Sequence, residues 1–236
     1  MPLDDPQSVK EQYAREDNLR ARQGLYEEVV GPRAPDVLWA TLVEWSPGKV
    51  LEVGGGPGEL SERLQREFGA DVSFVDISPR MVELAQERGV VAAQVGDVQA
   101  LPFPDCTFDT VVAAWMLYHV PDLDRGLAEI ARVLRSGGAL VAVTNSVRHL
   151  EELRELIAYP AGILESMFNA ENGEERLRKH FAEVERLDLE AEVTVRNRAK
   201  LVAYQQSMQV ATQPVPEHVD LPFIVHTRVS IFVAMT

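Results

Sequence analysis

A glycine-rich segment follows a short apolar run near the start of the chain. Residues 50–53 (VLEV) lead directly into Gly-Gly-Gly-Pro-Gly at 54–58, and a helical pattern comes next. A turn of this kind between a strand and a helix brings bare backbone close to a bound ligand. Glu52 stands two positions before the first glycine, so the pattern reads E-x-G-x-G-x-G. The pattern predicts a ligand site formed by Glu52, Gly54, Gly56 and Gly58.

The spacing of these glycines disfavours a nicotinamide site. A dinucleotide fingerprint requires G-x-G-x-x-G, but the sixth position is Glu59 when counted from Gly54 and Ser61 when counted from Gly56. A Tyr-x-x-x-Lys pair is also missing, because none of the 5 tyrosines has a lysine four positions later. A nicotinamide-dependent dehydrogenase is therefore disfavoured.

Two aspartates follow the next two apolar runs. Asp76 ends the run 72–75, where its two oxygens can each accept a ribose hydroxyl proton. It can also act as a helix cap, since Ser78-Pro79 is a typical helix start. Asp97 follows the run 90–95 and can accept from the exocyclic amine of an adenine ring, although Gly-Asp alone marks only a turn.

Strand and helix patterns alternate over the central part of the chain, which predicts a parallel sheet covered on both faces. The predicted strands are 50–53, 72–75, 90–95, 110–114 and 139–144, and the predicted helices cover 57–68, the segment from 78 and 123–134, the last closed by the turn 135–138. Outside this core we expect helices at 7–30 (interrupted at Gly24), 35–45, 150–157 and 174–181, and a last strand at 229–234.

Four motifs in this order carry a family resemblance. The segments VLEVGGGPGEL, VSFVDISPRMVELA, GDVQALPFPDCTFD and LRSGGALVAVT resemble those of class I S-adenosylmethionine-dependent methyltransferases, especially the small-molecule branch with the ubiquinone and menaquinone biosynthesis type. The resemblance covers residues 50–144. It implies an α/β fold with a doubly wound, mostly parallel, seven-stranded Rossmann-like sheet whose last strand is antiparallel.

The resemblance also implies S-adenosylmethionine as cofactor and a set of residues that contact it. These are Glu52 and Gly54 at the methionine end, Asp76, Ile77 and Met81 at the ribose and ring, and Asp97 and Val98 at the adenine. We also expect contacts from Gly56 and Gly58 in the turn, Ala114 at the end of the fourth strand and Tyr13 on the N-terminal helix. Residues 1–45 are predicted to form a helical cap, and residues 46–236 the Rossmann-like part with a lid at about 150–172, in one structural domain overall.

Methyl transfer requires alignment of a nucleophile and, where its pKa demands it, removal of its proton. His119 follows the fourth strand, and Asn145 and His149 follow the fifth, so these three are the candidate catalytic residues. His119 and Tyr118 are equally compatible with packing roles. The N-terminal cluster Tyr13, Arg15, Arg20 and Arg22 is either a solvated face paired with nearby acids or a group that folds over the carboxylate of the cofactor.

The composition narrows the partners. A net charge of −14 repels nucleic acids and anionic lipid, and the longest apolar run, 111–117, is too short to span a bilayer. The single cysteine, Cys106, is predicted to lie at the surface, and no metal-ligand spacing is present. We expect a cytoplasmic monomer or homodimer that acts on a neutral or cationic small molecule, without a nucleic-acid or membrane partner. The segment 113–116 reads A-A-W-M instead of the N-P-P-Y type of base-modifying enzymes, so an RNA methyltransferase is less favoured. A non-catalytic cofactor-binding module stays open.

Overall fold

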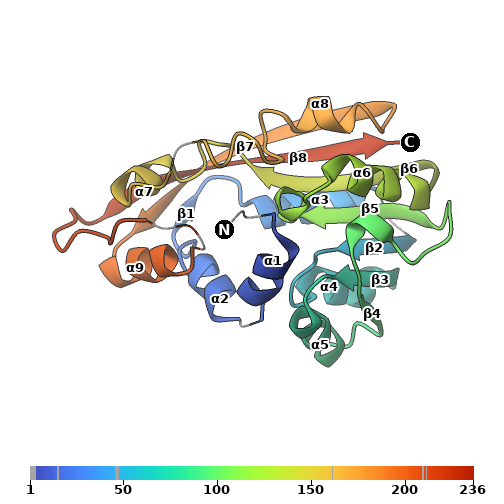
Figure 1. Ribbon diagram of the computed structural model, residues 1–236, viewed down its shortest axis with the longest axis horizontal. Coiled ribbons are helices and arrows are strands. Elements are labelled where there is room, and N and C mark those ends of the chain that lie inside the picture. Colours follow the sequence, from blue (N-terminus) through green and yellow to red (C-terminus); the bar gives the residue numbers. More distant parts are fainter. Residues whose placement is uncertain (1–3, 15, 46–47, 161, 209, 211) are drawn as a thin grey trace.

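The computed structural model describes residues 4–14, 16–45, 48–160, 162–208, 210 and 212–236. In these ranges eight strands form one sheet, with helices on both sides (Figure 1). The strands are β1 (Val29–Val30), β2 (Lys49–Val53), β3 (Asp71–Asp76), β4 (Ala92–Val95), β5 (Phe108–Ala114), β6 (Leu134–Asn145), β7 (Glu183–Val195) and β8 (Phe223–Met235). The α-helices are α1 (Pro6–Gln12), α2 (Asp17–Gln23), α3 (Ala34–Trp45), α4 (Glu59–Phe68), α5 (Pro79–Glu87), α6 (Leu123–Val133), α7 (Glu151–Leu156), α8 (Gly173–Leu177) and α9 (Arg198–Gln206).

The order of the strands is β1-β7-β8-β6-β5-β2-β3-β4. Strands β2 to β6 are parallel, and β8 is antiparallel to both of its neighbours, β6 and β7. The predicted mostly parallel sheet with an antiparallel last strand is therefore confirmed. The two-residue strand β1, antiparallel to β7, adds an eighth strand that the sequence did not indicate.

The hydrophobic core lies on both faces of the sheet because side chains alternate along each strand. Val50 packs with α3 and α4 on one face, whereas Leu51 and Val53 pack with α6 on the other. The amphipathic helix α6 places Leu127 and Ile130 against the sheet, as its helical spacing predicts. The helices thus fix the strands whose carboxyl ends form the site.

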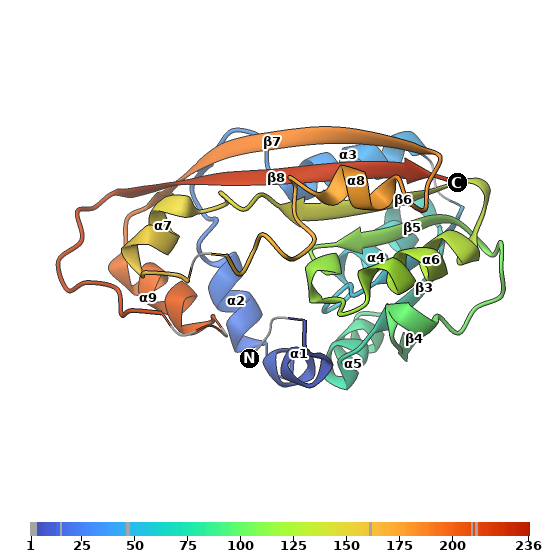
Figure 2. The same ribbon diagram turned by 45° about the horizontal axis from the view of Figure 1, so that its top comes forward.

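Strands β7 and β8 are much longer than the predicted last strand. They pair from Glu183–Met235 to Val195–Phe223, and their far ends extend beyond the carboxyl end of β6. A separate apolar cluster packs on this extension, with residues from α7, α9 and the segment after α2 (Figure 2). The long hairpin therefore carries a covering layer past the carboxyl ends of the parallel strands.

Several predicted boundaries are corrected by the structure. The helix after the glycine turn begins at Glu59 rather than at residue 57, since Gly58 is its left-handed N-cap residue. Residues 135–138 belong to β6, with a register shift near Phe108, and do not form a closing turn. The predicted helical stretch 7–30 is divided into α1 and α2 and ends in β1. The helix start at Ser78-Pro79 is confirmed, because the Ser78 hydroxyl accepts from the Met81 amide.

Candidate functional site

One cavity of about 920 Å³ lies at the carboxyl ends of the parallel strands, beneath the N-terminal helices and the extension of β7 and β8. It brings together nearly all of the residues that the sequence singled out. Those that line it are Glu52, Gly54, Gly56, Asp76, Ile77, Met81, Asp97, Val98, Ala114, Tyr13, His119, Asn145 and His149.

The glycine turn contributes bare backbone to the wall of this cavity. The Gly54 amide donates to the Val75 carbonyl over 2.7 Å, which holds the turn against β3. Gly56 has φ +57°, and a Cβ built there would meet no described atom within 4 Å outside its chain neighbours. Because Gly56 lines the cavity, such a Cβ would occupy space where a ligand can approach the backbone.

Gly58, unlike Gly54 and Gly56, does not line the cavity. It has φ +79°, and an added Cβ would lie 2.7 Å from the Cβ of Ala85 on α5. The glycine at this position therefore allows the start of α4 to pack closely against α5.

Two buried carboxylates face the turn. The Asp76 Oδ1 accepts from the Ser78 amide over 2.8 Å, and its Oδ2 accepts from the Gly56 amide over 3.2 Å. Burial raises the pKa of Asp76 to about 6, against the opposing effect of these two bonds. Ser78, and not Asp76, provides the side-chain cap of α5. The carboxylate of Asp76 therefore serves the turn and the cavity.

Glu52 ends β2 beneath the turn and is 2% exposed. Its Oε2 accepts from the Ser61 hydroxyl in a short hydrogen bond. Burial raises the pKa of Glu52 to about 7, and the nearby Asp76 acts in the same direction. A cationic group entering the cavity would favour the ionised form of this carboxyl and be attracted by it.

The segment after β4 forms the wall of the cavity opposite the glycine turn. We call this part of the cavity, from the turn to Asp97, the cofactor half. Asp97 accepts from the backbone amide of Gln99 over 2.9 Å and from its side-chain amide. Val98 and Met81 are buried and line the cavity next to Ile77. A carboxylate between apolar side chains is the arrangement that we expected for a planar ring with an exocyclic amine.

Helix α1 and Tyr13 cover this half of the cavity, whereas α2 packs against α9. The carbonyl of Tyr13 accepts from the Ser78 hydroxyl over 3.1 Å, and the hydroxyl of Tyr13 lies 3.2 Å from His119 Nε2. The predicted arginine cluster divides: Arg20 pairs with Glu16 at the surface, whereas Arg22 lines the cavity and donates to the carbonyl of Ser207. Arg15 lies outside the described residues.

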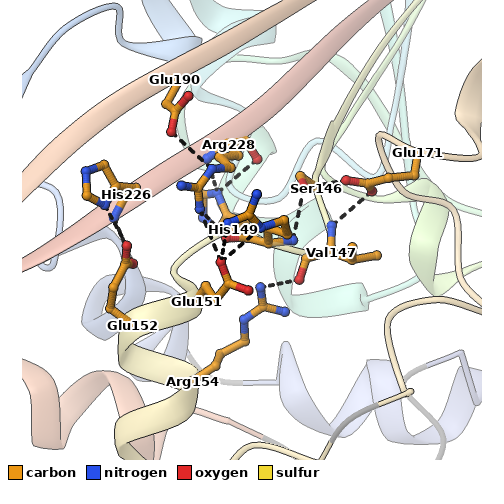
Figure 3. Close-up of polar contacts among 11 residues, drawn as sticks. Ser146, Val147, His149, Glu151, Glu152, Arg154, Glu171, Glu190, His226 and Arg228 are labelled. Atoms are coloured by element: carbon orange, nitrogen blue, oxygen red, sulfur yellow. Dashed lines mark hydrogen bonds and ion pairs between the residues drawn. The ribbon is translucent and has the colours of Figure 1, made fainter.

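The residues after β5 and β6 form the other half of the cavity. The Asn145 Oδ1 accepts from the Trp115 indole over 3.1 Å, which fixes its orientation. His149 is buried, and its Nε2 lies 3.0 Å from the Tyr26 hydroxyl. Its Nδ1 lies 3.1 Å from the backbone nitrogen of Arg228 (Figure 3). Burial, with the positive charge of Arg154, lowers the pKa of His149 to about 3. A histidine in this state is neutral and takes up a proton poorly, which weakens its predicted role as base.

The predicted lid segment contacts the end of β6. Glu171 accepts from the Ser146 hydroxyl over 2.5 Å and from the Val147 amide over 3.0 Å (Figure 3). The Thr144 hydroxyl donates to the Phe168 carbonyl, and Phe168 lines the cavity. The segment thus lies over the half of the cavity that the residues after β5 and β6 form.

Sequence reasoning missed several lining residues on or just after the covering helices. All of the tyrosines line the cavity, and among them Tyr26, Tyr159 and Tyr204 were not predicted there. Arg154 on α7 was also missed. No local motif marks these residues, because tertiary packing alone brings α2, α7 and α9 together.

Three further expectations concern absences and the cysteine. Among the described residues, no group of three or more His, Cys, Asp or Glu side chains is placed to hold a metal ion. The same residues include no helix that is long and apolar enough to cross a membrane. Cys106 is exposed, as predicted.

Known proteins resemble the central part of this chain. Residues 51–142 match the family model described as "Methyltransferase domain". The chain is 36% identical over 124 residues to a malonyl-[acyl-carrier protein] O-methyltransferase of Pseudescherichia vulneris. The aligned region makes up 52% of this chain and 49% of that protein. It is 38% identical over 114 residues to the ubiquinone/menaquinone biosynthesis C-methyltransferase UbiE of Cellvibrio japonicus. This aligned region makes up 44% of this chain and 46% of that protein. The chain thus spans about half the length of the curated relatives that it matches.

The fold extends the similarity to the whole chain. The crystal structure of the [4+2]-cyclase SpnF matches with a TM-score of 0.63 at 21% identity and covers 100% of this chain and 98% of its own. At this identity the match shows the fold alone. Residues 51–142 therefore resemble the methyltransferase domain of enzymes such as UbiE, in the part of the chain that carries the four motifs.

Proposed function

We propose that the protein transfers a methyl group from S-adenosylmethionine to an oxygen, nitrogen or carbon nucleophile of a small-molecule acceptor, a metabolite or natural product. One observation carries the proposal: a single cavity joins the glycine turn and Asp76 to the polar residues after β5 and β6. A cofactor and an acceptor placed in these two halves would meet within one cavity.

The residues present fit the cofactor. Gly56 leaves open space at its missing Cβ, the Asp76 carboxylate lies between the turn and Ser78, and Glu52 is a buried carboxyl that a cationic amine would satisfy. When bound, S-adenosylmethionine supplies an electrophilic methyl group on a sulfonium. The chain holds the donor and the acceptor in line and excludes water, which is the main contribution that a protein can make to such a displacement.

The polar residues of the acceptor half have different tasks in this proposal. His119, which contacts Tyr13, is the group that removes a proton where the nucleophile carries one. Asn145, held by Trp115, orients the acceptor. His149, neutral and bonded at both nitrogens, positions Tyr26 and the start of β8 rather than acting as base.

A non-catalytic role, or a reaction other than methyl transfer, is the alternative that the fold leaves open. The SpnF structure is described as a cyclase, so the same fold serves other chemistry. RNA as acceptor is disfavoured by the net charge of −14. The predicted cytoplasmic location and the monomeric or homodimeric state are parts of this proposal that need their own measurements.

Calorimetric titration tests the cofactor assignment. We expect saturable binding of S-adenosylhomocysteine and S-adenosylmethionine, and no specific binding of NAD or NADP, because the glycine spacing and the Asp76 carboxylate suit a single nucleoside rather than a pyrophosphate. The same protein sample, tested for folding by circular dichroism, serves all four titrations. Tight binding of NAD without binding of S-adenosylhomocysteine would overturn the proposal.

A further inference from the structure

We infer that the acceptor carries a terminal oxyanion, a carboxylate or a phosphate, which is bound at the covered end of the cavity by Arg154 together with Arg22. The inference rests on the proposed function, because it names the chemical class that the acceptor half would select. It reverses the neutral or cationic acceptor that the net charge suggested.

Arg154 lines the cavity with hydrogen-bonding capacity left over. Its Nη2 donates to the carbonyl of Val147, and its Nε is buried without any hydrogen-bond partner (Figure 3). Within the described ranges no carboxylate forms an ion pair with it: Glu151 pairs instead with Arg148 and Arg228. Burial lowers the pKa of the Arg154 guanidinium. A half-buried guanidinium in this condition is stabilised by an anion that accepts from its free N–H group.

Charge is divided between the two halves of the cavity. The carboxylates that line it, Glu52, Glu59, Asp76 and Asp97, all come from the cofactor half, between β2 and the end of β4. Of the four described arginines that line the cavity, Arg33 precedes α3 and Arg63 lies on α4, near these carboxylates. Arg22 and Arg154 lie on α2 and α7, which cover the other half, and no described carboxylate lines the cavity there. The local field at the covered end is therefore positive although the whole chain is acidic.

The two arginines act on the same tyrosines. Both guanidinium groups lower the pKa of Tyr159 and of Tyr204, which places them around a shared space. Burial outweighs this effect and raises the pKa of both hydroxyl groups, so they stay protonated and can donate to an oxyanion. Planar guanidinium groups with hydroxyl donors suit carboxylate and phosphate oxygens and have no favourable contact with an ammonium.

The cavity also offers apolar side chains to the body of a ligand. Leu164, Met167, Phe168 and Met208 lie in the same cavity. A ligand that fits both features has an apolar body and an anionic end. The geometry leaves the opposite end of such a ligand nearer the cofactor half.

Simple amphiphiles test this selectivity without knowledge of the natural acceptor. The protein, saturated with S-adenosylhomocysteine, is titrated with octanoate, octyl phosphate, octanamide and octylamine. We expect octanoate or octyl phosphate to bind about ten- to a hundredfold more tightly than octanamide, since hydrogen bonds between charged groups are the stronger kind. Whichever of octanoate and octyl phosphate binds with the higher affinity shows whether the site prefers a carboxylate or a phosphate. Octanamide or octylamine binding as tightly as both anions in the wild-type protein would overturn the inference.

Variants assign the effect to Arg154. Arg154→Met should bring the affinity for the anion down to that of octanamide, and Arg154→Lys should keep part of the preference because it keeps the charge without the planar fork. Arg148→Met is the matched control. This substitution also removes one positive charge, six residues earlier in the chain, but Arg148 is exposed and does not line the cavity. Equal loss in the Arg148 and Arg154 variants, or an unchanged preference in folded Arg154→Met, would contradict the assignment.

A failure of this inference differs from a failure of the proposed function. The wild-type and Arg154→Met proteins should bind S-adenosylhomocysteine with equal affinity. Absent binding of S-adenosylhomocysteine by the wild type would refute the cofactor site itself. Normal binding of S-adenosylhomocysteine with no preference for anions would refute only the oxyanion site.

Discussion

The substitution Asp76→Ala should weaken the binding of S-adenosylhomocysteine by about ten- to a hundredfold or more. In the proposed complex each oxygen of this carboxylate accepts a ribose hydroxyl, and such charge-assisted bonds contribute roughly 1.5–3 kcal/mol each, without full additivity. Asp71→Ala is the matched control, because Asp71 begins the same strand, is exposed and lies outside the cavity. The dissociation constants of both variants are measured by calorimetry.

The pH dependence of the same titration gives a second readout. Burial raises the pKa of Asp76 to about 6 and that of Glu52 to about 7 in the free protein. Binding by the ionised carboxylates then becomes weaker as the pH falls, first below about 7 and more steeply below about 6, where each group contributes about tenfold per pH unit. The Asp76→Ala variant should lose the lower step and keep the upper one. An unchanged affinity in a folded variant would mean that Asp76 only supports the turn.

Gly56→Ala should reduce cofactor affinity by about ten- to a hundredfold, because a methyl group would occupy space that the ligand needs and overpacking costs about 1–3 kcal/mol. Gly69→Ala provides the control for backbone strain. Gly69 has φ +64°, close to the +57° of Gly56, and an added Cβ there would also meet nothing described within 4 Å. Both substitutions place an alanine in the left-handed conformation, which lowers the free energy of unfolding by roughly 1–2 kcal/mol.

The comparison separates strain from occlusion. Thermal unfolding should show similar losses of stability in the two glycine variants, while calorimetry should show weaker binding only for Gly56→Ala. Gly69 ends α4 on the outside of the cavity, so its variant should bind as the wild type does. Equal affinities in the two variants would show that the ligand does not approach Gly56.

The parts of the site that local chemistry determines could be predicted from the sequence. The turn from Glu52 to Gly56 and the carboxylate of Asp76 are read from residues that are close together in the chain, and all of them line the cavity. The position of Gly58 could not be predicted in this way, because spacing cannot tell a glycine that faces a ligand from one that packs against Ala85. The parallel strands were found because they are short, buried and apolar.

The covering layer could not be predicted in the same way. Strand β7 carries charged side chains at its exposed positions, as in ERLDLE, and therefore lacks the apolar run that marks a buried strand. The position of Tyr204 on α9 and that of Arg154 on α7 depend on how this long hairpin folds over the site. The low pKa of His149 follows from its burial and from the positive charge of Arg154 on α7, which only the tertiary structure brings about.

The most direct test of methyl transfer to a small molecule uses S-adenosylmethionine labelled in its methyl group. The purified protein is incubated with the labelled cofactor and either a small-molecule extract or total RNA and DNA, and the label is followed after separation of the two fractions. His119→Ala and Asn145→Ala should lower the transfer while leaving the affinity for S-adenosylhomocysteine nearly unchanged. The account predicts label in the small-molecule fraction; label chiefly in nucleic acid would contradict it.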